Sequence, residues 1–360
     1  MTGAFSGARP YGPSQLRVAV SAAVRAPSLH NSQPWRFRLA DGAIEVRADP
    51  ARRLPASDPT GWAVRIACGA AVGNLRLALA AAGLPARAWL RPDPTDPDLI
   101  ARLTPDRPRP PTPTELALSA AIPRRYSNRA PFWPDPVPAD VRWRLAETVR
   151  DEGAWLELVI GSGAVTAVGE IARSAHRVLG RDAGYRAELT AWTRLSPAPD
   201  GVPADAGGPL GEPHDPLPQR DFGTRRRAPG RDFEPEPLVA VLGLAGNTSW
   251  DQIAAGQILQ RLLLTATDAG LAVSLLSQPI EVPSAREQLR LALGRSGTPQ
   301  MVMRIGYGQP GWPTARRSVD EVIDPSYPVA IGATGDGAAP ADGLPAEEGS
   351  KVPRSTDQQP

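Results

Sequence analysis

The chain has 360 residues, of which 41% are hydrophobic, so it is long enough for one large domain or two ordinary ones with a sizeable core. A formal net charge of only +2 argues against a dedicated nucleic-acid surface. Cys68 is the only cysteine, which excludes an intrachain disulfide and a cysteine-rich zinc site.

The N-terminus and the apolar stretches favour a protein that does not enter a membrane. The first residues lack the basic region and the apolar run of a signal peptide. The two most apolar stretches, residues 63–84 and 254–276, carry charged side chains that are costly in a bilayer, namely Arg65, Arg76, Arg261 and Asp268. We therefore expect a soluble, cytoplasmic protein without a membrane partner.

The first element in chain order is a helix that leads into a polar loop. After a flexible arm at residues 1–13, apolar residues from position 16 to 24 recur at the spacing of one helix face. Pro27 ends this helix, because proline disfavours the helical conformation in the preceding residue and has no amide hydrogen. Short polar side chains follow as far as Pro34, and residues 35–39 then alternate as in a half-buried strand. A polar loop held between two prolines suits recognition of a flat ligand rich in heteroatoms.

The rest of the first half reads as strand, helix and strand. Residues 43–47 are expected to pair with the preceding strand across an Asp41-Gly42 turn. An alanine-rich helix over residues 62–82 should end at Gly83, with a strand over 86–90 after it. Residues 91–113 are so rich in proline that we expect a connector, neither helix nor central strand.

The second half is expected to repeat this plan with longer insertions. Helices are predicted at residues 114–122, 137–150, 164–179, 184–194, 250–270 and 283–293, and strands at 155–160, 238–244, 271–276 and 301–307. Residues 196–237, rich in Pro, Gly and Asp, should be either disordered or a lid, and the tail at 329–360 should be disordered. Both halves contain a long apolar helix that ends in Ala-Gly-Leu. We therefore predict an internally duplicated α+β fold, with units at 14–108 and 109–328 and central sheets flanked by long helices.

Two clusters of arginine suggest phosphate binding. Arg124, Arg125, Ser127 and Arg129 follow Pro123, and Arg316-Arg317 lie near the C-terminus. A guanidinium can form two parallel hydrogen bonds with phosphate oxygens, and a nearby hydroxyl can add a third. Either cluster could equally be a solvated basic surface.

Three motifs resemble those of a known family. Residues 26–37, A-P-S-L-H-N-S-Q-P-W-R-F, resemble the flavin-binding loop of the nitroreductase family, and the His30-Asn31 pair is similar to its Acg-like branch. The run R-R-Y-S-N-R-A-P-F at 124–132 is similar to the family's opening motif, in which the first arginine and the serine hold the FMN phosphate. Arg316-Arg317 and the residues after them are similar to the family's C-terminal phosphate-binding arginine and its last strand. The resemblance covers residues 14–325 and implies the nitroreductase α+β fold.

The resemblance also implies which residues bind FMN. The implied cofactor-binding residues are Pro27, Ser28, His30, Asn31, Gln33, Arg124, Arg125, Ser127, Arg316 and Arg317. The loop residues would recognise the isoalloxazine ring and the others the phosphate. Arg124 and Ser127 take the phosphate role first, and the choice within each arginine pair stays open. No catalytic acid or base is expected, because flavin carries the chemistry.

Each half of the chain carries only part of this set. In the family, two identical subunits share two flavin sites, with the loop from one subunit and the arginines from the other. Here the first half has the loop without the arginine run, and the second half has the arginine run without the loop. We therefore expect one FMN site per chain, in a monomer that imitates the family homodimer.

Two functions follow from the resemblance. The first is an oxidoreductase that uses FMN to pass electrons from NAD(P)H to nitroaromatics, quinones or similar small-molecule acceptors. The alternative is a protein that binds and sequesters FMN under a closed lid, with little or no turnover. Other motifs fit less well: Gly161-Ser162-Gly163 lacks the third glycine of a dinucleotide-binding turn, and no G-x-S-x-G hydrolase motif occurs.

Overall fold

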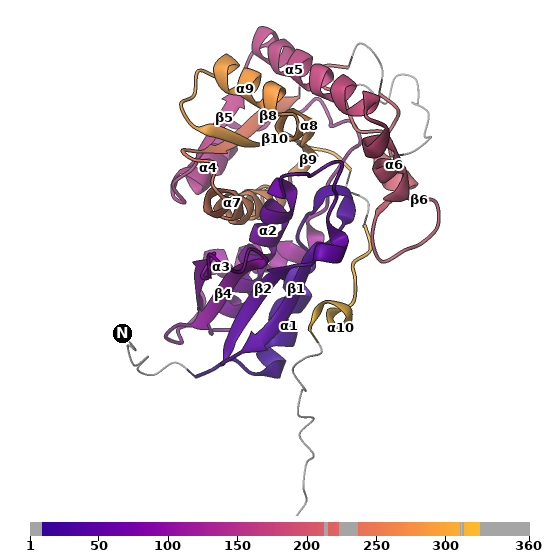
Figure 1. Ribbon diagram of the computed structural model, residues 1–360. Helices are drawn as coiled ribbons and strands as arrows, with labels where there is room; N and C mark the ends of the chain where they lie inside the picture. Colours follow the sequence, from indigo (N-terminus) through magenta and orange to yellow (C-terminus); the bar gives the residue numbers. More distant parts are fainter. Residues whose placement is uncertain (1–8, 212–214, 223–236, 310, 312, 325–360) are drawn as a thin grey trace, which may run out of the picture. The chain divides into compact units, whose positions relative to one another are not determined.

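Two four-stranded antiparallel sheets organise the computed structural model, which describes residues 9–211, 215–222, 237–309, 311 and 313–324 (Figure 1). The first sheet has the strand order β1-β2-β4-β3, and the second has β5-β8-β10-β9. When the four strands of each sheet are numbered from 1 to 4 in chain order, both sheets have the order 1-2-4-3. This shared topology supports the predicted duplication and the predicted α+β class.

The bounds of the elements follow the chain. The strands are β1 (Trp35–Ala40), β2 (Ala43–Ala48), β3 (Ala86–Leu90), β4 (Leu99–Pro105), β5 (Trp155–Val159), β6 (Thr193–Arg194), β7 (Val202–Pro203), β8 (Leu238–Leu244), β9 (Ala272–Leu276) and β10 (Thr298–Gly306). The α-helices are α1 (Pro13–Ala23), α2 (Trp62–Ala81), α3 (Pro113–Ala121), α4 (Ala139–Arg150), α5 (Ser162–Arg181), α6 (Ala183–Ala191), α7 (Ser249–Asp268), α8 (Gln278–Glu281), α9 (Pro283–Ala292) and α10 (Val319–Val322). The predicted boundary at residue 108 falls between β4 and α3, and the two halves pack into one compact unit.

Local sequence signals explain most of these elements. The β1–β2 hairpin turns at Asp41 and Gly42, whose φ angles of 50° and 71° are those of the predicted turn. Gly83 ends α2 with a φ of 77°. Thr112 caps α3, since its side chain accepts from the amide of Glu115 while the Glu115 carboxylate accepts from the amide of Thr112.

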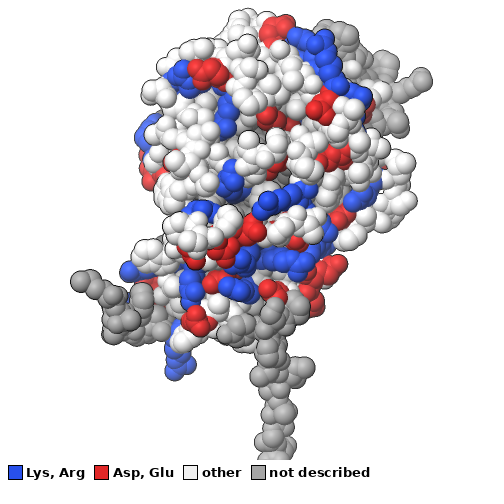
Figure 2. All heavy atoms as spheres, viewed as in Figure 1, with Lys and Arg blue, Asp and Glu red and all other residues white. Residues whose placement is uncertain are grey.

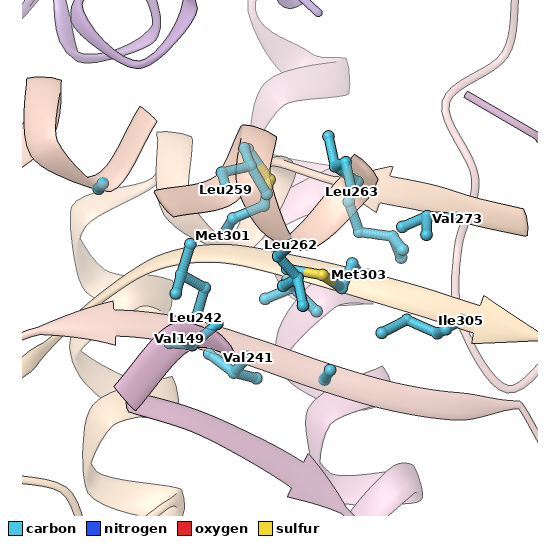
Figure 3. Close-up of a cluster of buried hydrophobic side chains, with 14 of the residues drawn as sticks. Val149, Val241, Leu242, Leu259, Leu262, Leu263, Val273, Met301, Met303 and Ile305 are labelled. Carbon is cyan, nitrogen blue, oxygen red and sulfur yellow. The ribbon is translucent and has the colours of Figure 1, made fainter. Parts of the chain in front are cut away.

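The larger core lies between the second sheet and α7. In Figure 3, leucines of α7 face side chains of β8 and β10 across this core. The labelled members are Val149, Val241, Leu242, Leu259, Leu262, Leu263, Val273, Met301, Met303 and Ile305. A second core packs Trp35, Phe37 and Ile44 of the first sheet against α1 and α2. Burying each such side chain contributes about 1.5–3 kcal/mol before chain entropy is counted.

Helices α2 and α7 lie side by side (Figure 1). Their backbones come close at two glycines. Gly69 is the eighth residue of α2 counted from Trp62, and Gly256 is the eighth of α7 counted from Ser249. A Cβ on Gly69 would lie 2.1 Å from the carbonyl oxygen of Ile253, so only glycine lets the backbones come this close. The two halves therefore meet through equivalent positions of their repeats.

We expect Gly69→Ala to destabilise the protein by about 1–3 kcal/mol, because the added methyl group must push the two helices apart. Gly73→Ala on the same helix is the matched control. Its Cβ would meet its nearest neighbours at 3.6 Å, an ordinary contact, so alanine's better helix propensity should stabilise the protein by up to about 1 kcal/mol. Urea unfolding of both variants measures the difference. Equal changes in the free energy of unfolding for the two variants would contradict the close approach of the helices at Gly69.

Three sequence predictions are wrong in part. Residues 99–105 form β4, a central strand between β2 and β3, although residues 91–113 were expected to be a connector. The prolines cluster on both sides of L-I-A-R-L-T and leave these six residues free to pair. The expected last strand after Arg317 is instead helix α10, followed by a single bridge from Ile323 to Phe37. Tyr11, within the expected flexible arm, is buried, and its hydroxyl donates to the carbonyl oxygens of Leu84 and Pro85.

Several other expectations fall on particular segments. Of the predicted lid at 196–237, the described parts contain β7 and a short 3₁₀ turn at Ala204–Gly207. Residues 212–214 and 223–236 of that segment, the tail at 329–360 and residues 1–8 lie outside the described residues.

Helix α2 is long and apolar enough to cross a membrane, but 72% of its most apolar window is buried inside the protein, as in a core helix. On the face in Figure 2, basic and acidic side chains are interspersed.

Candidate functional site

The loop after α1 adopts an unusual backbone conformation. His30, Asn31 and Gln33 have φ angles of 52°, 54° and 52°, in the left-handed region that non-glycine residues rarely occupy. Each such residue costs about 1–3 kcal/mol and persists only where the surroundings hold it. Within the loop, the Ser28 hydroxyl accepts a 3.0 Å hydrogen bond from the amide of Gln33.

Two amide side chains of this loop hold other parts of the chain. Asn31 Nδ2 donates to the carbonyl oxygens of Gly201 at 2.9 Å and Ala315 at 3.1 Å. Gln33 Nε2 donates to the carbonyl oxygen of Pro199 at 2.8 Å, while its Oε1 accepts from the amide of Arg317 at 2.8 Å. The loop therefore fastens residues 199–201 and 315–317 against the first half.

A cavity of about 110 Å³ lies beside this loop, and both halves of the chain line it. Its apolar wall includes Trp62 and Ile66 of α2, Leu259 of α7 and Met301 of β10. Seven of the ten predicted site residues line it: Pro27, Ser28, His30, Asn31, Arg125, Ser127 and Arg316. The structure thus brings together the loop of the first half and the arginines of the second.

The remaining three predicted residues do not line the cavity. Gln33 is fully buried and bridges two chain segments, as described above. Arg124 is exposed and its Nε donates to Ala120 in the preceding helix. Arg317 lies 3.5 Å from the Asp49 carboxylate and donates to the carbonyl oxygen of Glu321. Of the first pair, the structure therefore places Arg125 at the cavity and Arg124 outside it, because a 3₁₀ turn ends at Arg124 and the chain then carries Arg125 inward.

Positive charge collects at the cavity without a matching carboxylate. Burial lowers the pKa of Arg125 to about 10. Burial, followed by the charges of Arg125 and Arg25, lowers the pKa of Arg316 to about 9. Among the described residues neither Arg125 nor Arg316 has a carboxylate partner, and the Nε atoms of both are buried without a hydrogen bond. Such an arrangement disfavours the charged arginines unless an anion joins them.

A second group of side chains, from the segment predicted as a lid, also lines the cavity. Arg220 lies in a buried ion pair with Glu281 of α8, at 2.6 Å. The ring of Phe222 lies 4.9 Å from the guanidinium of Arg129, whose pKa burial and the Arg220 charge lower to about 10. Arg220 and Phe222 carried no sequence signal, since their roles depend on partners far away along the chain. Arg129 lay inside the arginine motif, but no role was assigned to it.

Two other kinds of site, a dinucleotide-binding turn and a metal site, find no support among the described residues. Gly161-Ser162-Gly163 does follow β5 and open α5, but β5 belongs to an antiparallel sheet, not to a βαβ unit that binds dinucleotides. In the part of the chain that the structure describes, no group of three His, Cys, Asp or Glu side chains could hold a metal ion.

Comparison with known proteins identifies close relatives. Two proteins of Mycobacterium tuberculosis H37Rv carry the name "Putative NAD(P)H nitroreductase", namely Rv3131 and acg. Rv3131 is 33% identical over 318 residues, which cover 86% of this chain and 91% of the relative. The acg protein is 31% identical over 319 residues, which cover 86% of this chain and 95% of the relative. The "Uncharacterized protein Rv3127" of the same organism is 32% identical over 326 residues, or 86% of this chain and 92% of the relative.

Solved structures are more distantly similar. A nitroreductase with bound FMN from Desulfitobacterium hafniense is 14% identical, with a TM-score of 0.39 over 57% of this chain and 96% of that protein. The FMN and NADPH-dependent nitroreductase NfnB from a Sphingopyxis strain is 21% identical, with a TM-score of 0.36 over 57% of this chain and 97% of that protein. No model of a protein family matches the sequence.

Proposed function

The chain belongs to the nitroreductase family, and on that premise we propose that it binds FMN and passes electrons from NAD(P)H to a small-molecule acceptor. Membership confirms the resemblance predicted from the loop at 26–37 and the arginine motifs, and with it the predicted fold. The acceptors we propose are nitroaromatics, quinones or related compounds.

The observation that carries this proposal is the pair of arginines without a counter-charge. Arg125 and Arg316 both line the cavity, and so does Ser127. A phosphate monoester would supply the missing negative charge and accept hydrogen bonds from both guanidinium groups. Ser127 is held in place by its bridge to Val273 of β9, so its hydroxyl could add a further contact.

The remaining walls suit the flat ring of a flavin. The apolar side chains of α2, α7 and β10 offer a surface on which a ring system can pack, as in most cofactor sites. FMN, when bound, supplies the electron-transfer chemistry. The residues of this chain bind the phosphate, orient the ring and exclude water.

A second candidate function is sequestration of FMN beneath the segment at 199–222. The cavity of about 110 Å³ is smaller than the roughly 300–1,000 Å³ of typical ligand sites. Five residues of this segment line it: Val202, Pro218, Gln219, Arg220 and Phe222. The amides of Asn31 and Gln33 hold residues 199–201 in place. Under this alternative, the segment stays closed over bound FMN and admits no electron donor.

We expect the purified chain to be a monomer that carries about one non-covalent FMN, because each half supplies only part of the site. Addition of NADH or NADPH without oxygen should bleach the flavin absorbance. Light scattering, extraction of the flavin and anaerobic spectroscopy measure these three properties. A chain that neither contains nor takes up FMN contradicts the proposal. Bound FMN that photoreduction bleaches, but neither nucleotide does, favours sequestration.

A further inference from the structure

A second, larger cavity lies at one end of the second sheet. Its volume is about 390 Å³, within the roughly 300–1,000 Å³ of typical ligand sites. The segment at 132–137, helix α4, the start of α5 and the adjoining ends of β5, β8 and β10 contribute its lining. No described residue lines both this cavity and the candidate FMN site. The chain therefore has a second place where a small molecule can bind.

The aromatic wall of this cavity is held in place by the sheet. Phe132 is 4% exposed, and a Cβ on Gly306 of β10 would lie 2.8 Å from its ring. The amide of Trp133 donates to the carbonyl oxygen of Tyr307 at 2.8 Å. Two prolines follow at 134 and 136 and restrict the backbone further. A ligand would meet a wall that is already ordered, which lowers the entropic cost of binding.

Two large apolar side chains of this cavity lie in water. Trp133 is 52% exposed and Ile160 is 66% exposed, and both line the cavity. Single exposed apolar residues are common, but these two share a concave surface with the buried side chains of Val137, Val159 and Ile305. An aromatic ring in the cavity would remove this apolar surface from water, which is favourable.

Arg142 of α4 supplies a positive charge to the same cavity. Among the described residues that line it, Arg142 is the only cation, and its side chain has no hydrogen bond or ion pair with the described part of the chain. Its Nε is buried within the protein, whereas its two Nη atoms stay accessible. These Nη atoms are the donors that a ligand can reach, and a carboxylate matches a guanidinium in charge and in planar geometry.

The other polar residues of the cavity limit the charge of the ligand. Ser162 and Thr166 lie one turn apart on α5, and their hydroxyls can donate to an anion. Asp135 is exposed and also lines the cavity, and no ion pair joins it to Arg142. One guanidinium beside one carboxylate suits a single negative charge better than the double charge of a phosphate monoester, which Asp135 would repel more strongly.

We propose that this cavity binds an aromatic carboxylate, with its ring against Trp133 and Ile160 and its carboxylate on Arg142. The proposal goes beyond the proposed function, because it uses no residue of the candidate FMN site. 2-Naphthoate is the probe, and 2-naphthalenemethanol is a neutral molecule of similar shape. Isothermal titration calorimetry of the full chain, with and without saturating FMN, measures the binding of both.

We expect Arg142→Gln to weaken 2-naphthoate binding about tenfold and 2-naphthalenemethanol binding by less than twofold, because only the carboxylate pairs with the guanidinium. Asp135→Asn removes the opposing charge and should strengthen 2-naphthoate binding by up to about threefold. Arg144→Gln is the matched control, since Arg144 is exposed on the same helix and does not line the cavity. It should leave the binding of both probes unchanged.

Thr166→Trp tests the location of the probe without removing a charge. Position 166 is exposed on α5 and lines the cavity, so the larger side chain can fill part of the cavity without disturbing the core. Both probes should lose at least tenfold in affinity, while the Tm and the affinity for FMN stay unchanged.

Several results would overturn the inference. 2-Naphthoate that does not bind, that FMN displaces, or that binds equally well to the variants at positions 142 and 166 would show that this cavity is not its site. Equal losses of both probes in Arg142→Gln would show that the arginine does not recognise the carboxylate. A chain that binds no FMN fails the proposed function, whereas its titration with 2-naphthoate still decides the present inference.

Discussion

Replacing Arg125 or Arg316 with glutamine is expected to weaken FMN binding about ten- to a hundredfold, and replacing both should abolish it at micromolar concentrations. A hydrogen bond to a charged group contributes about 1.5–3 kcal/mol, and each arginine would supply at least one to the phosphate. Titration of the flavin-free protein with FMN, followed by quenching of flavin fluorescence, measures the loss.

The same substitutions should leave the flavin-free protein as stable as before, or slightly more stable. Both guanidinium groups are desolvated, and Arg316 lies near the charges of Arg125 and Arg25, so their removal relieves an unfavourable burial of charge. Loss of FMN affinity with an unchanged or higher Tm separates a binding role from a structural one. A lower Tm in both variants would mean that the arginines support the fold.

Riboflavin and Arg124→Gln provide the matched controls. Riboflavin lacks the phosphate, so its affinity should hardly change in the variants at positions 125 and 316. Arg124 adjoins Arg125 but is exposed and does not line the cavity, so Arg124→Gln should bind FMN normally. If Arg124→Gln weakens FMN and Arg125→Gln does not, the phosphate site has been assigned to the wrong arginine.

Glu281→Gln is expected to release the segment that carries Arg220. The side chains of Glu281 and Arg220 are 1% and 7% exposed, and removal of one partner of a buried ion pair costs about 3–5 kcal/mol. The chain can avoid this cost by moving residues 215–222 into water. Amide hydrogen exchange should therefore rise in that segment, and NAD(P)H should reduce the bound flavin faster.

Glu287→Gln on the neighbouring helix α9 is the control for this prediction. Glu287 pairs with Arg290 on the protein surface, where ion pairs contribute little to stability. Its loss should change neither hydrogen exchange at 215–222 nor flavin reduction. If Glu281→Gln lowers the Tm of the whole protein without local exchange, the ion pair supports the core and does not hold the segment closed.

The sequence alone was sufficient for the fold class, most element positions and the family. Helix α1 buries residues at a helical period that the chain displays locally, and strand β8 is a continuous apolar run that is buried almost throughout. Pro27 and Pro34 delimit the loop at 26–37 for stereochemical reasons that need no knowledge of the fold. The loop and the arginine motifs also pointed to the nitroreductase family without knowledge of the fold, because each motif is a contiguous run of residues.

Strand β4 and the choice within each arginine pair required the tertiary structure. L-I-A-R-L-T is short and lies among prolines, and its position between β2 and β3 depends on hydrogen bonds with partners elsewhere. Arg124 and Arg125 are chemically identical neighbours, and the direction of a turn decides which one faces the cavity.

The tertiary structure also decides which partner each polar side chain binds. Asn31 and Gln33 were predicted to contact a ligand; in the structure Asn31 does line the cavity, whereas Gln33 does not. Both side chains also bind residues 199–201 and 315–317, some 170 and 284 positions away. Arg220 and Glu281 are 61 residues apart and form one buried pair. A hydrogen-bonding side chain has the same sequence signature whether its partner is a ligand or the chain itself. Only the fold decides between the two, because it sets which groups are within reach and which are removed from water.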